Sequence, residues 1–239
     1  MPNGSVDERV DKLNQYVIQN GPHKIYYIPE FITKGEEEYL KDCVYKAPKP
    51  RWTQLQNRRL QNWGGIPHTK GMIAEELPSW LLTTVERIYE LGVFGEKKPN
   101  HVLVNEYLSG QGIMPHLDGP LFYPTITTVN LGSHGVLNFY RPMEQPNGES
   151  GVVEDWAERL EFSLLLEPRS LLILQETCYN NFLHGIEERS SDLITDKILN
   201  VNQCQELKLN NELSRDTRIS LTIRHVPKTT KPILRLGRR

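Results

Sequence analysis

The chain has 239 residues, a mass of 27.7 kDa, a hydrophobic content of 38% and a mean hydropathy of −0.51. This length suits one compact domain with a sizeable core. No run approaches the roughly 20 apolar residues of a membrane span, and the first residues lack the apolar stretch of a signal peptide. Three widely spaced cysteines argue against a disulfide framework. We therefore expect a cytoplasmic or nuclear protein, or both, without a membrane partner.

The net charge of −2 conceals an uneven distribution. Between Asp42 and Glu75 the chain has six basic residues and no acidic one. After Asp216 it has seven basic residues and again no acidic one. Two positive segments on an otherwise acidic chain indicate a localised site for an anionic partner.

The first third of the chain is expected to be helical around one short strand. Residues 1–22 are polar and are expected to be flexible, and residues 24–28 are expected to form a strand. Thr33 and Glu36 have the spacing of a capping box that opens a helix, and a second helix should follow Pro78. The apolar faces of the two helices are predicted to be Tyr39, Leu40, Cys43 and Val44, and Leu81, Leu82, Val85, Ile88 and Tyr89.

From residue 101 onward short strand candidates follow one another. They are 101–108, 125–131, 136–140, 161–167, 170–175 and 218–226, with several turn signals between them. Helices first and strands afterwards predict an α+β, β-rich fold with a jelly-roll (double-stranded β-helix) core. We expect one domain over residues 23–226, insertions at about 142–159 and 189–215, and a basic tail at 227–239.

His116 and Asp118 are the first candidates for chemistry. In an extended segment, residues two apart point to the same side, so these two side chains can bind one ion. His184 is a candidate for a third ligand from elsewhere in the chain. Two histidines and one carboxylate leave coordination positions open, as in non-haem Fe(II) oxygenases. The competing interpretation is a surface turn whose histidine only forms hydrogen bonds.

The segment from Arg218 to Arg224 strengthens the metal hypothesis. If it is a strand, one face is apolar and the other carries two arginines. Arginines on an inward face need anionic partners, and a small dicarboxylate with one end on the metal meets that need. The alternative is an exposed edge strand with two solvated arginines. The residues predicted to contact such a co-substrate are Asn105, Tyr107, Arg218, Ser220, Thr222 and Arg224.

The order Asn105-x-Tyr107, His116-x-Asp118, His184 and Arg218-x5-Arg224 resembles the AlkB family of Fe(II)- and 2-oxoglutarate-dependent dioxygenases. The resemblance covers about residues 24–226, and segments 47–55, 60–65 and 115–121 are most similar to the sixth AlkB homologue branch. It implies a jelly-roll core with N-terminal helices and a substrate lid at about 46–72. It also implies Fe(II) on the two histidines and the aspartate, with 2-oxoglutarate and O2 as co-substrates.

The resemblance further implies oxidative demethylation of alkylated nucleic acid, either RNA or DNA. Within the lid, basic residues suit phosphates and aromatic residues suit stacked bases, although tryptophans near prolines also serve as packing residues. Two alternatives remain, namely an oxygenase acting on a protein or small molecule and a non-catalytic binder of modified nucleic acid. The candidate substrate-contacting residues are Trp52, Arg58, Arg59 and Trp63.

Overall fold

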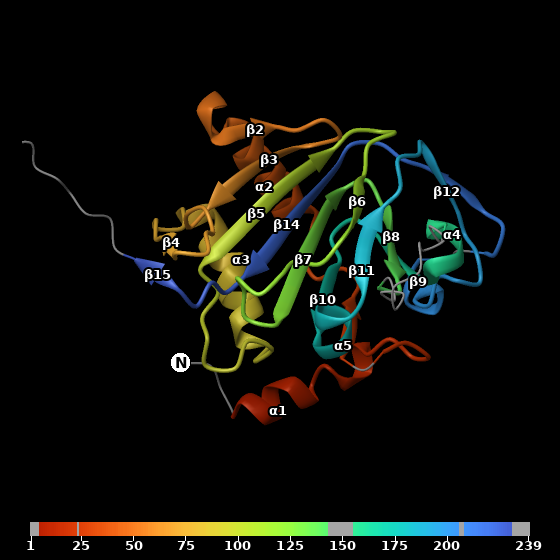
Figure 1. Ribbon diagram of the computed structural model, residues 1–239, viewed down its shortest axis with the longest axis horizontal. Helices are drawn as coiled ribbons and strands as arrows, with labels where there is room; N and C mark the ends of the chain where they lie inside the picture. Colours follow the sequence, from red (N-terminus) through yellow and green to blue (C-terminus); the bar gives the residue numbers. More distant parts are fainter. Residues whose placement is uncertain (1–4, 23, 143–154, 206–207, 231–239) are drawn as a thin grey trace, which may run out of the picture.

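Two β-sheets face each other in the computed structural model, which describes residues 5–22, 24–142, 155–205 and 208–230 (Figure 1). The larger sheet has seven strands, in the order β1 (Ile25–Ile28), β10 (Leu171–Gln175), β7 (Thr125–Gly132), β14 (Arg218–Arg224), β5 (His101–Tyr107), β3 (Arg59–Trp63) and β2 (Trp52–Gln54). The smaller sheet has four strands, in the order β6 (Ile113–His116), β11 (Leu183–Ile186), β8 (Gly135–Tyr140) and β9 (Leu160–Leu166). The predicted β-rich jelly-roll class is confirmed.

The helices lie outside this pair of sheets. Two longer helices, α2 (Lys34–Lys46) and α3 (Ser79–Glu90), pack on the larger sheet, and the short ones are α1 (Val6–Asp11), α4 (Trp156–Arg159) and α5 (Glu176–Asn180). Short 3-10 helices span Asn14–Tyr16, Lys49–Arg51 and Val201–Gln203. Among the described residues, no helix has the length and apolar character needed to cross a membrane.

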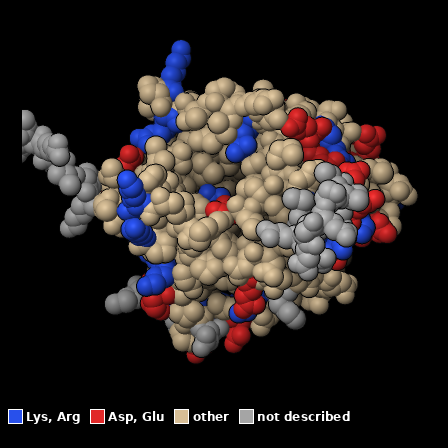
Figure 2. Space-filling model, viewed as in Figure 1, with Lys and Arg blue, Asp and Glu red and all other residues tan. Residues whose placement is uncertain are grey.

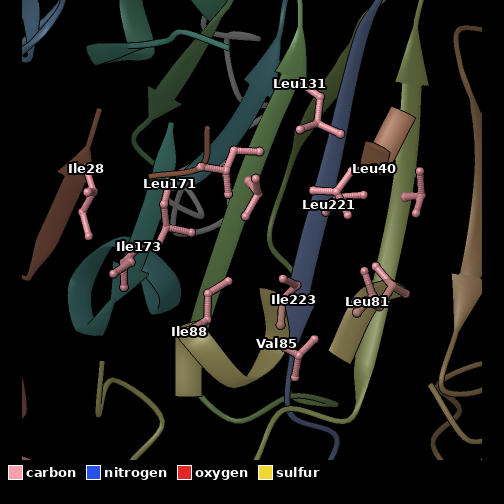
Figure 3. Close-up of a cluster of buried hydrophobic side chains, with 14 of the residues drawn as sticks. Ile28, Leu40, Leu81, Val85, Ile88, Leu131, Leu171, Ile173, Leu221 and Ile223 are labelled. Atoms are coloured by element: carbon pink, nitrogen blue, oxygen red, sulfur yellow. The ribbon is translucent and has the colours of Figure 1, made fainter. Parts of the chain in front are cut away.

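Apolar and polar residues alternate along β14, so the larger sheet has an apolar face toward the helices and a partly polar face toward the smaller sheet. Ile219, Leu221 and Ile223 point to the helix side, where they pack with residues of α2 and α3 such as Leu40 and Val85 (Figure 3). The polar residues of the same strand point to the other sheet. A second apolar cluster, which includes Tyr27, Phe139, Phe162, Leu164 and Leu172, lies between the sheets. The helix side is thus sealed by hydrophobic packing, and the space between the sheets is partly polar.

The N-terminal region contains a helix that the prediction lacked. A capping box between Ser5 and Glu8 starts α1, and the following Leu13 is buried. The predicted capping box of Thr33 and Glu36 is confirmed at the start of α2. Tyr39 and Leu82, predicted on the apolar faces of α2 and α3, are instead exposed. Each lies at the margin of its apolar stripe, where it turns toward water.

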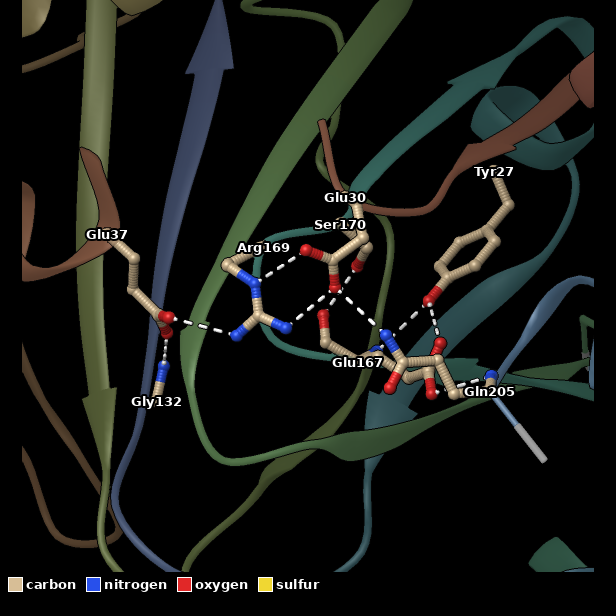
Figure 4. A network of polar contacts seen from close by, with 8 residues as sticks. All are labelled: Tyr27, Glu30, Glu37, Gly132, Glu167, Arg169, Ser170 and Gln205. Carbon is tan, nitrogen blue, oxygen red and sulfur yellow. Dashed lines mark hydrogen bonds and ion pairs between the residues drawn. The ribbon is translucent and has the colours of Figure 1, made fainter. Parts of the chain in front are cut away.

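A polar network fixes α2 and the end of β1 against the turn between β9 and β10 (Figure 4). The guanidinium of Arg169 donates to both oxygens of Glu30, at 2.8 and 2.6 Å, and to Glu37, at 3.2 Å. The other oxygen of Glu37 accepts a hydrogen bond from the backbone nitrogen of Gly132, at 2.7 Å. The hydrogen bond to Glu30 raises the pKa of Arg169 further. These contacts set where helix and sheet meet.

The predicted insertion at 189–215 is built into the fold rather than standing off its surface. It contains the hairpin of β12 (Ser191–Leu193) and β13 (Glu212–Ser214). Ile194 and Ile198 are buried against the smaller sheet, and the fully buried Asn200 side chain forms two hydrogen bonds with the backbone of Leu165, at 2.9 and 2.8 Å. Most of the other predicted insertion, 143–154, lies outside the described residues, and its end forms α4.

The start of the basic tail joins the lid region. Strand β15 (Thr229–Thr230) pairs in parallel with β4 (Met72–Ile73), which closes the segment predicted as the lid. Residues 231–239 of the tail lie outside the described residues. Two strands absent from the prediction, β6 and β11, turn out to position the candidate metal ligands.

Candidate active site

Three candidate metal ligands meet between β6 and β11. These strands pair in antiparallel register with His116 directly opposite His184, and Asp118 follows His116 by two residues. One ligand atom from each of the three side chains lies within 4.8 Å of the other two. The two imidazole rings have centroids 4.6 Å apart, and His184 Nε2 lies 3.3 Å from Asp118 Oδ2. The strand pairing therefore gathers residues that are far apart in sequence.

The electrostatics of this cluster suit a divalent cation. Burial lowers the pKa of His116 to about 4, with a further contribution from His184, so its imidazole is neutral at pH 7. Burial alone would raise the pKa of Asp118, but Arg224, His184 and His116 together outweigh burial and lower the pKa to about 2. Asp118 Oδ2 and His184 Nδ1 are buried without a hydrogen-bond partner. Two imidazoles and a carboxylate are the ligands of a non-haem Fe(II) site. Metal ligands have to be deprotonated, and His116 and Asp118 are so at pH 7.

Arg224 and Arg218 occupy opposite ends of the same strand face. Arg224 Nη2 donates to Asp118 Oδ1, and its guanidinium lies over the Phe122 ring, 4.5 Å from the centroid. Arg218 Nη2 donates to Asn130 Oδ1, at 2.6 Å, and its guanidinium lies 5.6 Å from the Tyr107 ring centroid. Arg224 thus belongs to the candidate metal site, and Arg218 lies at the other end of the strand, away from the metal ligands.

Arg218 needs an anion. Its side chain is buried, and burial lowers its pKa to about 10. Among the described residues its side-chain partner is the neutral Asn130, and its Nε has no hydrogen-bond partner. A buried guanidinium without a carboxylate partner is costly, so an anionic ligand at this position stabilises the site. A carboxylate that reaches it from the metal has to be the distal group of a short dicarboxylate.

A cavity of about 110 Å³ joins the candidate metal ligands to Arg218. Strand β5 aligns Asn105 with Ser220 and Tyr107 with Arg218, so the amide, the phenol and the guanidinium share this space. The volume matches a small molecule. All nine sequence-predicted residues for metal and co-substrate line it, namely Asn105, Tyr107, His116, Asp118, His184, Arg218, Ser220, Thr222 and Arg224.

A wider groove of about 400 Å³ opens beside the cavity. It runs between the tip of the β2–β3 hairpin (residues 55–58) and residues 112–116. Arg58 lines both spaces, and its Nε donates to Asn105 Oδ1, at 3.2 Å. The neighbouring Asn57 donates to Glu188 beyond β11. The hairpin tip therefore spans the site from β5 to the end of β11.

The other candidate substrate residues lie on the opposite, helix-facing side of the sheet. Arg59 donates to both oxygens of the buried Glu106, at 2.7 and 2.9 Å, and lies 4.1 Å from the Trp52 ring centroid. Trp63 meets Trp80 edge to face, with 5.6 Å between centroids. Of the four predicted substrate residues, only Arg58 lines the cavity or the groove. The other three are packing residues in this structure.

Sequence reasoning missed residues that support the cavity from neighbouring elements. Asn130 holds Arg218, Phe122 lies over Arg224, and Tyr179 donates to the backbone oxygen of Gly119, at 2.6 Å, just after Asp118. The one visible signal was Asn130 between the apolar Val129 and Leu131, because a buried amide needs a polar partner. The partners of Phe122 and Tyr179 depend on loop positions that no local pattern defines.

The fold and this site together define an oxygenase class. The family model described as "2OG-Fe(II) oxygenase superfamily" matches residues 24–224, and the chain belongs to this superfamily of Fe(II)- and 2-oxoglutarate-dependent dioxygenases, which use O2 as the second co-substrate. Within it the chain is an AlkB family member. It is 50% identical to "Probable RNA/DNA demethylase ALKBH6" of Danio rerio, over 97% of this chain and 98% of the relative.

Other relatives are more distant. The Arabidopsis thaliana "Alkylated DNA repair protein ALKBH8 homolog" is 28% identical, over 73% of this chain and 54% of that protein. The solved structure of OsALKBH1 matches with a TM-score of 0.52 at 14% identity, covering 87% of this chain and 100% of that one. A Pseudomonas putida prolyl-4-hydroxylase matches with a TM-score of 0.53 at 11% identity, covering 94% and 99%. At these identities the solved structures support the shared fold.

Proposed function

We propose that this dioxygenase demethylates alkylated bases in nucleic acid, RNA or DNA, with His116, Asp118 and His184 as the iron ligands. The Danio rerio relative, half identical over nearly the whole chain, is named a probable RNA/DNA demethylase. The observation that carries the proposal is the groove of about 400 Å³ that opens beside His116 and the cavity. A nucleotide needs such an open approach, because a base must leave its stack to reach a buried metal.

The chain's own residues divide the work between binding and orientation. Arg218 binds the distal carboxylate of 2-oxoglutarate, while Asn105 and Tyr107 offer an amide and a phenol to the same molecule. Arg224 holds one oxygen of the Asp118 carboxylate, and the other oxygen would be available to bind Fe(II).

Bound Fe(II) supplies the oxidation of a C–H bond by O2, coupled to the conversion of 2-oxoglutarate to succinate and CO2. One oxygen atom enters succinate, and the other converts an N-methyl group to N-hydroxymethyl. The hydroxymethyl product then breaks its C–N bond, releases formaldehyde and leaves a proton on the base nitrogen. The protein contributes the positions of the reacting groups to this reaction.

The test is reconstitution with Fe(II) and 2-oxoglutarate under anaerobic conditions, followed by O2 and a panel of methylated oligonucleotides. The expected result is equal formation of succinate and formaldehyde with at least one modified base, measured by mass spectrometry, and no product from Asp118→Ala. Succinate released with a protein or small molecule, and never with an oligonucleotide, would overturn the proposed substrate. Binding of modified oligonucleotides without succinate would favour a non-catalytic binder.

A further inference from the structure

The two acid-free basic segments of the sequence meet in the folded chain. Met72 N donates to Lys228 O, at 2.9 Å, where β4 begins its pairing with β15. Lys228 Nζ donates to the backbone oxygen of Thr69, at 3.2 Å. Lys70 and Lys228 are both exposed, and among the described residues neither forms an ion pair with a carboxylate. We call residues 66–73 and 227–230 the β4–β15 edge.

The β4–β15 edge lies beside the active-site hollow. Lys228 follows Arg224 by four residues, and Arg224 contacts Asp118. A chain covers at most about 3.6 Å per residue, so the Lys228 backbone lies within about 14 Å of the Arg224 backbone. Figure 2 shows blue side chains over β4 and β15 on one side of a central hollow. A phosphate bound at this edge would therefore be close, along the nucleic-acid chain, to a base in the active site.

The opposite rim of the hollow carries the other charge. Glu187 and Glu188 follow His184 by three and four residues, so their backbones lie within about 14 Å of the His184 backbone. Both are exposed, and red side chains lie on that side of the hollow with blue ones among them (Figure 2). Arg189 pairs with Glu187, but the described side-chain partner of Glu188 is the neutral Asn57. The carboxyl group of Glu188 therefore has no cationic partner among the described residues.

We propose that a single-stranded nucleic acid leaves the active-site hollow over the β4–β15 edge only, with flanking phosphates on Lys70 and Lys228. Glu188 repels phosphates from the other side, because like charges at this range disfavour approach. The exposed Ile73 offers apolar surface to the bases between the phosphates. The inference rests on the proposed function and adds to it a direction, since the strand is held on one side of the modified base.

The direction follows from charge rather than from shape. The groove beside β6 borders Arg58, which reaches the mouth with no carboxylate partner among the described residues. A cavity of about 450 Å³ on the Glu187 and Glu188 side is larger and lined by Trp156 and Tyr140. The carboxylates of Asp155 and Glu188 in its lining disfavour a polyanion there. The larger volume of this cavity is therefore no sign that the nucleic acid binds in it. Phosphate contacts dominate the affinity for nucleic acid.

The experiment uses fluorescence anisotropy with oligonucleotides of about ten nucleotides, a typical site size for single strands. One probe has the methylated base at its 5′ end, and a second has it at its 3′ end, so that the flank extends in one direction only. The protein is loaded with Fe(II) and 2-oxoglutarate without O2. The variant is Lys70→Glu with Lys228→Glu, and the matched control is Lys12→Glu with Lys34→Glu, which makes the same charge change at exposed positions in or beside α1 and α2.

Wild type should bind one probe at least about 10-fold more tightly than the other. The Lys70 and Lys228 variant should abolish that preference and lower the salt slope for the preferred probe by about 1.4, at about 0.7 per phosphate contact on a single strand. The control should retain both. Glu188→Gln should strengthen the weaker probe and leave the stronger one unchanged, since it removes a repulsion on the other side.

Equal binding of both probes by wild type would overturn the inference, as would equal loss in the variant and its control. These outcomes differ from failure of the proposed function. In that case wild type binds neither probe at low salt and forms no formaldehyde from either. An intact succinate yield with Lys70→Glu and Lys228→Glu on a methylated mononucleoside shows that the charge reversal leaves the iron site unharmed.

Discussion

The two faces of the seven-stranded sheet use the same residue types in opposite ways. On the helix face Arg59 is paired with Glu106, and Gln61 donates to the backbone oxygen of Val44, at 2.9 Å. On the cavity face the Nε atoms of Arg218 and Arg224 are buried without partners. Buried polar groups are normally satisfied, so unsatisfied groups confined to one face mark the places where a ligand completes the structure.

The contrast is sharpest between two consecutive residues. Arg58 and Arg59 differ by one position and face opposite sides, because Arg58 bonds Asn105 and Arg59 bonds its neighbour Glu106. Arg58 reaches the cavity and the groove, whereas Arg59 forms a structural ion pair with Glu106. The same contrast separates effects on ligand binding from effects on folding in the variants below.

The largest effect is expected from His184→Ala, which removes one metal donor of three. Stoichiometric Fe(II) binding under anaerobic conditions should be lost, since two remaining ligands hold an open site poorly, and circular dichroism should show an intact fold. His68→Ala is the control, because His68 is exposed and lies outside the cluster. Retained stoichiometric binding would show that the third ligand lies elsewhere.

Next in size is Arg218→Ala, which removes a charge-assisted contact worth about 1.5–3 kcal/mol. Affinity for 2-oxoglutarate should fall roughly 10- to 150-fold, with Fe(II) affinity unchanged, as measured by calorimetry. Arg224→Ala should reduce Fe(II) affinity as well, because Arg224 holds Asp118. If the two variants changed the Fe(II) affinity equally, Arg224 would not differ from Arg218 in its contribution to the metal site.

Much of this site could be predicted from the sequence, because alternation along a strand fixes which residues share a face. The polar face of β14 follows from Arg218, Ser220, Thr222 and Arg224 alone, and β5 presents Asn105 and Tyr107 in the same way. The register of His116 opposite His184 does not follow, since β6 and β11 have four residues each and β6 contains Pro115. Short strands of this kind show too little periodicity to be predicted.

The side of the sheet on which each lid residue lies could not be predicted from the sequence, for a different reason. Basic and aromatic residues in the lid suited a nucleic acid equally well, but only pairing with β5 decides that Arg59 and Trp63 face the helices. The start of α1 was readable, because Ser5 and Glu8 have the same capping-box spacing as Thr33 and Glu36 at the start of α2. Polarity outweighed this signal in the prediction.

A smaller effect should separate the two adjacent arginines. Arg59→Met leaves Glu106, whose side chain is 4% exposed, without its partner, and the free energy of unfolding in urea should fall by about 1–3 kcal/mol. The loss stays below that of a fully buried pair, because the Arg59 side chain is 37% exposed. Arg58→Met should leave stability nearly unchanged and weaken oligonucleotide binding. The reverse pattern would contradict the assignment of faces.

The smallest effect expected is a dependence of stability on pH in the metal-free protein. Burial lowers the pKa of His101 to about 3 and that of His116 to about 4, whereas unfolded histidine titrates near 6.5. Below about pH 6.5 the unfolded chain therefore binds protons that the folded chain does not, so the free energy of unfolding falls as the pH drops toward 4. His101→Gln should lessen that slope between about pH 6.5 and 5, before most carboxylates titrate. His68→Gln should not change it, because His68 is exposed. Urea denaturation at a series of pH values measures both, and an unchanged slope in His101→Gln would mean that this imidazole is protonated in the folded protein.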